Sequence, residues 1–341
     1  MSCLPWHISE FERLLAGRAA LGHALLIHGP RGIGKLAFAT ALAQALLCEG
    51  SGRAGGACEV CPACVWFAAG NHPDIRRVEP ESLAAKPSGE EQPAEKGSSD
   101  QITVDQIRAL ADFVGASGHR GRAKVILVHP AEALNLNAAN ALLKSLEEPP
   151  AGTIFLLVAH RPSYLPATVR SRCRKVCLER PDVDAAAAWL KAQGIADPAL
   201  ALAHTGNAPL VARELAQADY WQRRNDLFTS LADPGFDALA TAERVRDYDV
   251  EEVVGWLQKW SFDILLQHSV DSIRYNPDFS RPIASLASGI DILALLHYHR
   301  ELIRLQRVVE HPLNARLLFE RLLIDYQRAV APAAPGTRKA A

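Results

Sequence analysis

The sequence predicts an α/β domain with a mostly parallel sheet, followed by an all-helical region. Three short apolar runs, Ala24–His28, Val125–His129 and Ile154–Ala159, are continuous rather than alternating, as in parallel strands that are covered on both faces. Segments with a helical pattern separate these runs, and strands that alternate with helices build α/β domains. From Pro181 onward the apolar residues recur at helical spacing, and no run predicts a strand.

Local signals predict the elements of the α/β domain in order. The first apolar run ends in a Gly-rich loop, after which the Ala- and Leu-rich stretch Lys35–Leu47 predicts a helix. A second helix is predicted over Ala131–Leu146 and ends before two consecutive prolines, which cannot continue it. The segments Cys48–Asn71 and Val78–Asp100 interrupt this order. The second has too little apolar content to form a core, so we expect a mobile loop of about residues 78–100.

The C-terminal third is predicted to be a helical bundle. In two segments apolar residues fall at three- and four-residue steps, which predicts amphipathic helices with a wide buried stripe. The stripe residues are Val250, Val253, Val254, Leu257, Ser261, Ile264 and Leu265 in the first segment, and Ile292, Leu295, Leu296, His299, Leu302, Ile303 and Val309 in the second. The last residues, 331–341, are expected to be a disordered tail.

Composition excludes several classes of protein. The chain has 341 residues, with 37 Lys and Arg against 38 Asp and Glu, so its formal net charge of −1 argues against a surface coated with positive charge for wrapping nucleic acid. No apolar run is long enough for an ordinary transmembrane helix, and the first ten residues lack the pattern of a secretory signal. We therefore expect a cytoplasmic protein, in which seven cysteines point to metal or core positions more than to disulfides.

A phosphate-binding loop is predicted between the first strand and the first helix. Gly29, Gly32, Gly34 and Lys35 stand in the pattern G-x-x-x-x-G-K, in which backbone N–H groups curl around phosphates and the lysine reaches the β and γ phosphates. The loop predicts a site where ATP or ADP can bind. The alternative is a relic loop whose glycines serve only the packing of strand against helix.

The usual supports for Mg²⁺ are missing from this loop and from the following strand. A Ser or Thr hydroxyl should follow the lysine, but Leu36 has no ligand atom. Acidic residues should end the second strand, but His129 and Pro130 stand there, and Mg²⁺ prefers oxygen ligands. Because phosphoryl transfer relies on that metal, we expect no useful ATP hydrolysis by this chain.

Four cysteines form a candidate metal site. Cys48, Cys58, Cys61 and Cys64 have the spacing C-x9-C-x2-C-x2-C. Four thiolates satisfy tetrahedral Zn²⁺ and leave no open position, which predicts a structural rather than a catalytic zinc site. Reduced cysteines in a small core and an iron–sulfur cluster are the alternatives, because C-x2-C-x2-C also occurs in iron–sulfur proteins.

A basic cluster follows the third apolar run. Arg170, Arg172, Arg174 and Lys175 lie in VRSRCRK. One interpretation is a solvated or phosphate-contacting patch. The other is an arginine that acts in trans, because a protein that keeps a nucleotide fold without its own Mg²⁺ ligands can still act on the nucleotide of a neighbour.

Together these motifs resemble the delta-prime family of subunits of the bacterial DNA polymerase III clamp loader, which belongs to the AAA+ proteins. The similarity runs nearly from end to end of the chain, and the degraded nucleotide motifs favour this family over its ATP-hydrolysing relatives. The matching segments are Pro5-Trp6, His23–Lys35, the four-cysteine insert with His72–Asp74, Ile102–Leu110, Asn137–Pro150, Arg170–Cys173 and His311–Leu323.

The resemblance implies a RecA-like AAA+ domain with an inserted zinc module, a small helical lid and an all-α collar domain. It also implies a ring with gamma or tau ATPase subunits and delta, in which this chain is a non-hydrolysing stator and not an enzyme on its own. Arg172 of the Ser-Arg-Cys motif would point at ATP on the adjacent gamma or tau subunit, and the ring would load the sliding clamp onto primed DNA within the cytoplasmic replisome. The expected boundaries are 1–179 for the RecA-like domain, about 48–70 for the zinc insert, 180–220 for the lid and 221–330 for the collar.

Two other functions remain as alternatives at this point. The first is an ATP-hydrolysing motor subunit similar to gamma or tau, against which Leu36, His129 and Pro130 argue. Pro209 also stands in the region where active relatives carry a nucleotide-sensing arginine. The second is a zinc-dependent nucleic-acid-binding module, which the near-neutral charge does not favour.

Overall fold

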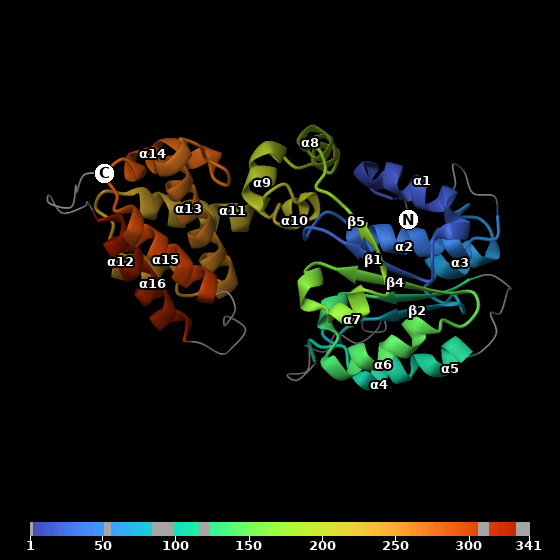
Figure 1. The fold of residues 1–341 in the computed structure, drawn as a ribbon. Coiled ribbons are helices and arrows are strands. Elements are labelled where there is room, and N and C mark those ends of the chain that lie inside the picture. Colours follow the sequence, from blue (N-terminus) through green and yellow to red (C-terminus); the bar gives the residue numbers. More distant parts are fainter. Residues whose placement is uncertain (1–2, 51–55, 84–98, 116–122, 306–313, 332–341) are drawn as a thin grey trace. The chain divides into compact units, whose positions relative to one another are not determined.

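The chain divides into two compact units, Met1–Ala185 and Ala186–Ala341 (Figure 1). The computed structural model describes residues 3–50, 56–83, 99–115, 123–305 and 314–331. Residues 84–98 of the expected loop and 332–341 of the expected tail lie outside these ranges. The finer division into three domains, with boundaries at 179 and 220, stays a prediction.

The first unit is built on a parallel sheet of five strands in the order β2-β3-β4-β1-β5. The three predicted strands are confirmed as its centre, and two strands that were not predicted form its edges. The central strands are β1 (Ala24–His28), β3 (Lys124–Val128) and β4 (Thr153–Ala159), and the edge strands are β2 (Ile75–Val78) and β5 (Arg174–Cys177).

Helices cover both faces of the sheet (Figure 1), which explains why the central strands are apolar throughout. Alternate residues of one strand enter different cores. Leu25 and Ile27 pack on one side, while Ala24 and Leu26 pack on the other. The first side holds α1 (Ile8–Ala16), α2 (Lys35–Leu47) and α3 (Pro62–Ala68), and the second holds α4 (Val104–Arg108), α5 (Leu110–Gly115), α6 (Leu136–Glu147) and α7 (Ala167–Arg170).

The helix predicted over Ala131–Leu146 is broken near its start, which corrects the prediction. A short 3-10 turn covers Ala131–Ala133, and α6 begins only at Leu136. The side chain of Asn135 accepts a hydrogen bond from the backbone N–H of Ala138 at 2.8 Å. Asparagine is favoured at this capping position because its side chain satisfies an N–H group that the helix leaves unpaired.

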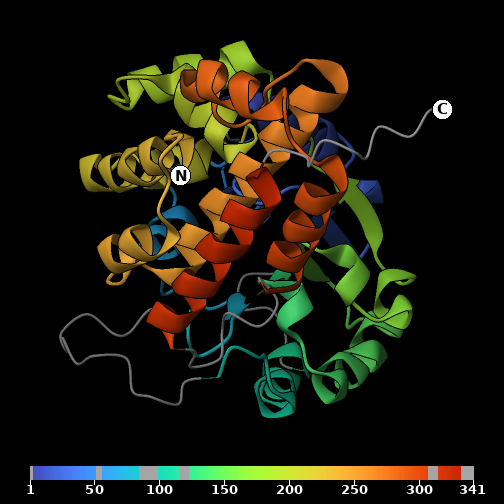
Figure 2. The same cartoon turned by 90° about the vertical axis from the view of Figure 1, so that its left-hand side faces the viewer.

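Every helix or strand that the structure describes in the second unit is a helix, as predicted. Within it α13 packs on α14 and α15, and α16 packs on α12 and α15 (Figure 1, Figure 2). None of the helices in the described ranges is both long and apolar enough to cross a membrane. The helices are α8 (Val183–Ala192), which begins at the boundary, α9 (Pro198–Thr205), α10 (Pro209–Glu214), α11 (Ala218–Ala232), α12 (Ala238–Val245), α13 (Val250–Val270), α14 (Ser280–Ala287), α15 (Ile292–Leu305) and α16 (Ala315–Val330).

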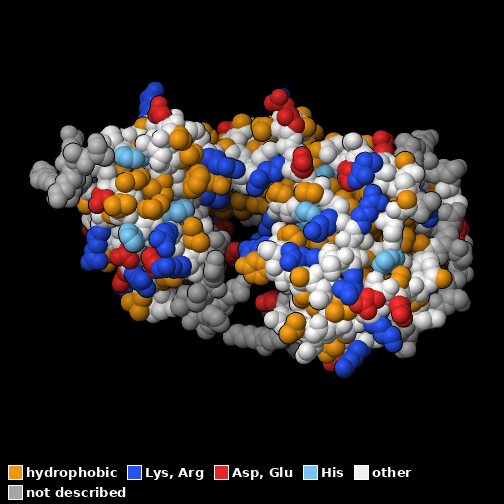
Figure 3. All heavy atoms as spheres, viewed as in Figure 1, with side chains coloured by type: hydrophobic (Ala, Val, Ile, Leu, Met, Phe, Trp, Pro, Cys, Tyr) orange, Lys and Arg blue, Asp and Glu red, His pale blue; other side chains and the backbone are white. Residues whose placement is uncertain are grey.

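The two predicted apolar stripes, on α13 and α15, differ in how closely their burial matches the prediction. The stripe of α13 is buried or half-buried along its length and is joined by Trp256 and Trp260. The stripe of α15 is narrower than predicted, because Leu296 and Ile303 are each 43% exposed while Tyr298 is buried instead. Val309, the last residue of the predicted stripe, lies outside the described residues. Over α12 and α16 basic and acidic side chains lie next to one another, in agreement with the ion pairs of these helices (Figure 3).

Candidate phosphate loop, metal centre and exposed arginine

The phosphate loop lies between β1 and α2, in the predicted order of strand, loop and helix. At Gly29, where φ is 150°, a Cβ atom would lie 2.1 Å from the backbone oxygen of Leu178, so only glycine fits. Gly34 precedes the first residue of α2 with φ of 96°, a left-handed conformation that favours glycine. Gly32 also has a positive φ. The backbone shape of this loop therefore depends on its glycines.

Lys35 is buried inside its own loop, with only 2% of its surface exposed. Its ammonium group donates a hydrogen bond to the backbone oxygen of Pro30. Burial lowers the pKa of Lys35 to about 8, with a contribution from the charge of Arg31 and against the opposing charge of Glu132. The lysine that should reach a phosphate thus contacts the loop itself.

Two residues near the start of the chain, Trp6 and His7, contact the backbone of the phosphate loop. The indole Nε1 of Trp6 donates to the backbone oxygen of Ile33 at 2.9 Å, and Nε2 of His7 lies 2.8 Å from the same oxygen. Burial lowers the pKa of His7, although its bond to Ile33 opposes the shift. The sequence carried no local signal for these contacts, since they join residues more than 25 positions apart.

The carboxyl ends of β3 and β4 bring together His129, His160 and Glu132 beside the loop. The two imidazole rings are perpendicular, with centroids 5.4 Å apart. Burial lowers the pKa of both histidines to about 4, and the charge of Lys35 contributes to each shift. Both rings are therefore neutral at pH 7. His160 and Glu132 were not identified from the sequence.

The carboxylate of Glu132 is engaged by the backbone. It accepts hydrogen bonds from the N–H of His160 at 2.8 Å and from the N–H of Arg161 at 2.9 Å. It is also the acidic group whose charge acts on Lys35. A carboxylate that caps the end of β4 in this way is poorly placed to hold Mg²⁺ or to orient an attacking water.

The four predicted metal ligands come together in space. The Sγ atoms of Cys48, Cys58, Cys61 and Cys64 lie within 4.8 Å of one another. Cys48 directly follows α2, while Cys61 caps α3 and accepts a bond from the backbone N–H of Cys64 at 3.4 Å. The backbone N–H groups of Val60 and Cys61 lower the pKa of Cys58. Such donors stabilise thiolate, the form that binds metal.

The spacing of the sulfur atoms fits a single ion. Zn–S bonds of about 2.3 Å in a tetrahedron place sulfur atoms roughly 3.8 Å apart, and two of the pairs, Cys48 with Cys61 and Cys58 with Cys64, lie at 4.0 Å. A disulfide would need a distance of about 2.05 Å. In iron–sulfur clusters the four cysteines are divided between two irons or placed on four different irons, so their sulfurs are spread further than around one ion. The geometry favours one tetrahedral ion such as Zn²⁺.

Arg172 lies just after α7 and two residues before β5. Its side chain is 34% exposed and forms an ion pair with Glu147 at the end of α6. The same guanidinium donates to the backbone oxygen of Thr168 at 2.9 Å. These contacts hold the arginine at the surface in a defined position, and part of its guanidinium group remains exposed to solvent.

The phosphate loop and Arg172 lie at opposite ends of two neighbouring strands, β1 and β5. The loop follows the carboxyl end of β1, whereas Arg172 precedes the amino end of β5, and the parallel register pairs Leu25 with Arg174. About five to six strand residues, or roughly 15–20 Å, separate the two positions. The chain therefore cannot bring Arg172 to a phosphate in its own loop without rebuilding the sheet.

Comparison with known proteins gives a consistent family match. Two family models match the chain: "DNA polymerase III, delta subunit" over residues 7–182, and "DNA polymerase III, delta subunit, C terminal" over residues 218–328. DNA polymerase III subunit delta′ of Pseudomonas aeruginosa is 35% identical over 340 residues, which cover 96% of this chain and 98% of the relative. DNA polymerase III subunit tau of Salmonella typhimurium is 36% identical over 173 residues, or 50% of this chain and 24% of the relative.

Among solved structures the chain is similar to a DNA polymerase III gamma subunit-related protein from Thermotoga maritima. The TM-score is 0.50 at 17% identity, and the match covers 95% of this chain and 99% of the other. At this identity the likeness concerns the fold alone. It agrees with a RecA-like AAA+ domain followed by helices.

Proposed function

Because the chain belongs to the DNA polymerase III subunit delta′ family, we propose that it is a clamp loader subunit that does not hydrolyse ATP itself. Its Arg172 completes the ATP site of a neighbouring gamma or tau subunit. With delta these subunits form the ring that loads the sliding clamp onto primed DNA in the cytoplasmic replisome. Similarity to a tau subunit over half of the chain supports a common architecture for the neighbours in such a ring.

One observation carries the first half of the proposal. Leu36 offers no Mg²⁺ ligand, His129 and Pro130 replace the acidic pair, and the nearby carboxylate of Glu132 is held by backbone N–H groups. Phosphoryl transfer needs Mg²⁺ to neutralise developing charge. A site without ligands for that metal has no means to lower the barrier.

Nucleotide binding is a separate property from hydrolysis. The loop keeps its glycines and Lys35, so we propose that ATP or ADP can bind there without being turned over. Lys35 must first leave the backbone oxygen of Pro30 before it can contact a phosphate.

The position of Arg172 supports action in trans. A guanidinium that is partly exposed and lies at the opposite end of the strands from the loop is positioned to contact a nucleotide on another chain. Arginine suits this role because its planar group is always charged and donates in a fork to phosphate oxygens. We further propose that Cys48, Cys58, Cys61 and Cys64 hold a structural Zn²⁺.

The purified chain is expected to show no ATP turnover with Mg²⁺, with or without primed DNA. The physical reason is the absence of Mg²⁺ ligands described above. The measurement is phosphate release at high protein concentration, with Lys35→Ala as the control for contaminating ATPases.

Turnover that matches the Lys35→Ala control supports the non-hydrolysing subunit. Turnover that needs Mg²⁺ and disappears in Lys35→Ala would instead restore the ATP-hydrolysing motor as the better function.

A further inference from the structure

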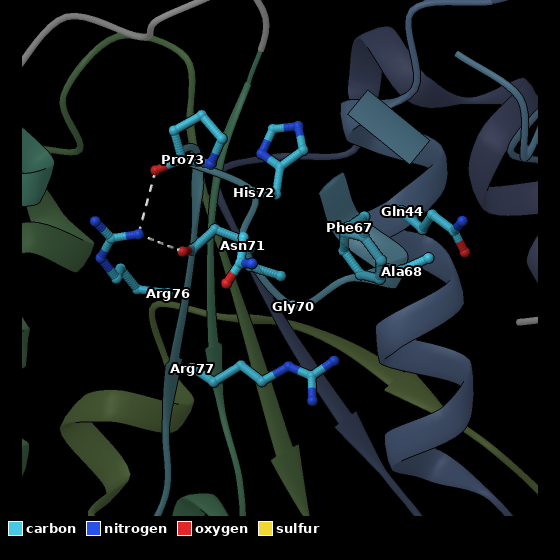
Figure 4. A pocket seen from close by; sticks show the side chains of 10 residues that line it. Gln44, Phe67, Ala68, Gly70, Asn71, His72, Pro73, Arg76 and Arg77 are labelled. Atoms are coloured by element: carbon cyan, nitrogen blue, oxygen red, sulfur yellow. Dashed lines mark hydrogen bonds between the residues drawn. The ribbon is translucent and has the colours of Figure 1, made fainter. Parts of the chain in front are cut away.

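A cavity of about 720 Å³ lies between the edge strand β2 and residues 56–70, the cysteine-bound segment that carries three of the four cysteines (Figure 4). Helix α2 packs on β1, β3 and β4 but does not extend over β2. Space therefore remains beside β2 on this face of the sheet. The end of α3 and the turn that follows it partly fill this place. The walls of the cavity thus come from α2, α3, the turn Gly70–Pro73 and β2.

Two neighbouring arginines of β2 point in opposite directions. Arg76 turns back to the backbone oxygens of Pro73 and Ile75, at 3.2 and 2.8 Å, and lies 4.5 Å from the ring centre of Phe113 (Figure 4). Arg77 extends the other way, from β2 toward α2. Its side chain is exposed and, across the described part of the chain, makes no hydrogen bond or ion pair. Arg77 is therefore a cation available to a ligand.

Among the described residues, no carboxylate forms an ion pair with Arg77. Burial raises the pKa of Glu79, and the charge of Arg77 opposes this shift, so the two groups influence each other. They do not form an ion pair. Because Glu79 makes no ion pair with Arg77, the guanidinium of Arg77 can still bind the carboxylate of a ligand.

The remaining walls combine apolar surface with amide groups. Phe67 and Ile75 supply apolar surface, and Gln44 and Asn71 supply side-chain amides that donate and accept hydrogen bonds. Gln44 is only 4% exposed although it lines the cavity. A peptide group pairs with such amides, an apolar side chain fits the apolar wall, and a carboxylate fits the arginine.

Among the described strands, β2 pairs only with β3, and its outer edge adds backbone groups to the same place. The N–H of Val125 donates to the oxygen of Asp74 and the N–H of His129 donates to that of Val78, so alternate residues of β2 face β3. The peptide groups of Arg77 therefore face the outer edge. An extended segment that lies along a sheet edge gains main-chain hydrogen bonds, while pockets beside the edge select its side chains.

Nucleic acid is a poorer match to this cavity. Binding to a phosphate backbone depends on several cations that neutralise several phosphates, and here Arg77 is the one cation that projects into the space unpaired among the described residues. Four thiolates with one Zn²⁺ add a formal charge of about −2 to the same segment. A ligand with one carboxylate next to an apolar group fits a site with one available cation and a nearby negative charge better than a polyanion does.

We propose that this cavity binds an extended peptide segment of a partner protein in which an apolar residue stands next to Asp or Glu. Arg77 binds the carboxylate, Phe67 and Ile75 contact the apolar side chain, and β2 pairs with the backbone. Gln44 lies nine residues, or roughly 13 Å, along α2 from Lys35. The docking site is thus separate from the phosphate loop and does not depend on the proposed role of Arg172.

The test uses the full, zinc-loaded chain as bait for a phage-displayed library of random heptapeptides. We expect the selected peptides to be enriched in Asp or Glu next to an apolar residue. A selected peptide is then synthesised with a fluorescein label and its affinity is measured by fluorescence polarisation. Arg77→Ala is expected to weaken binding at least tenfold, and a peptide with Lys in place of its acidic residue is expected to bind Arg77→Glu better than the original peptide does.

Arg76→Ala is the matched control, because Arg76 also lines the cavity from the same strand but its guanidinium turns to the backbone oxygens of Pro73 and Ile75, opposite to Arg77 (Figure 4). Its affinity should stay within twofold of the unchanged chain, with zinc content and circular dichroism of all variants alike. Equal affinity for Arg77→Ala, or selected peptides without acidic residues, would overturn the proposal. Binding of a labelled single-stranded oligonucleotide that depends on Arg77, without such peptide binding, would assign the cavity to nucleic acid instead.

Discussion

Replacement of Arg172 by alanine is expected to leave the ring assembled while clamp loading falls strongly. An arginine that stabilises the charge of phosphoryl transfer in trans accelerates the reaction by roughly 10³- to 10⁵-fold, so the one ATP site that it completes becomes nearly inactive. Other ATP sites of the ring keep their own arginines, and total DNA-stimulated hydrolysis therefore falls by the share of one site. Phosphate release and clamp loading by the reconstituted ring on primed DNA measure the two effects.

Neighbouring residues provide matched controls for Arg172. Arg174→Ala removes an exposed arginine two positions away, whose guanidinium donates to the backbone oxygen of Ala20 in the same chain, and loading should be retained. Arg172→Lys keeps a charge but loses the fork, and should restore little activity. Glu147→Gln removes the ion pair but leaves the guanidinium, so loading should persist. Normal loading by an intact Arg172→Ala ring would exclude this residue from the reaction.

Loss of the metal is expected to unfold the cysteine-bound segment while the sheet stays intact. Apparent metal-binding free energies in small zinc peptides are about 10–16 kcal/mol at pH 7, and that energy is folding energy. Cys64→Ser should therefore abolish zinc binding and expose α3, whose Phe67 is only 8% exposed in the core with α2. Metal analysis and hydrogen exchange of the amides of Ala63–Ala68 measure the two effects.

Cys177→Ser controls for the loss of a thiol, because Cys177 is exposed on β5 and lies outside the metal cluster. One zinc per chain and unchanged exchange are expected for this variant. Retention of zinc and of exchange protection in Cys64→Ser would refute the structural site. Iron with visible absorption in the freshly purified protein would favour the iron–sulfur alternative.

The central strands were predictable because they are buried on both faces, and the edge strands were not. β1, β3 and β4 read as continuous apolar runs. In the edge strands β2 and β5 single residues, Val78 and Val176, are fully buried, while arginines and other exposed residues make up most of the rest. Local pattern does not separate such strands from loops. They are recognised only once a neighbouring strand supplies their pairing.

The candidate sites divide in the same way. The four cysteines and the phosphate loop are local patterns, and their spacing was enough to predict that the cysteines come together and that the loop lies between a strand and a helix. Glu132 and His160 lie on different segments that meet only at the carboxyl edge of the sheet, so no spacing reveals them. The distance between Arg172 and the loop likewise depends on the direction of β5 in the sheet. The sequence pattern indicates only a basic cluster in this segment and does not reveal the strand.

The phosphate loop and Arg172 lie at opposite ends of the strands, so this chain has two different faces toward its neighbours. In a row of such domains each member offers an arginine to one neighbour and a nucleotide to the other. Under our proposal this chain retains only the arginine side, so it fits at one terminus of the row. A second copy set against the first would meet a loop that no arginine can activate.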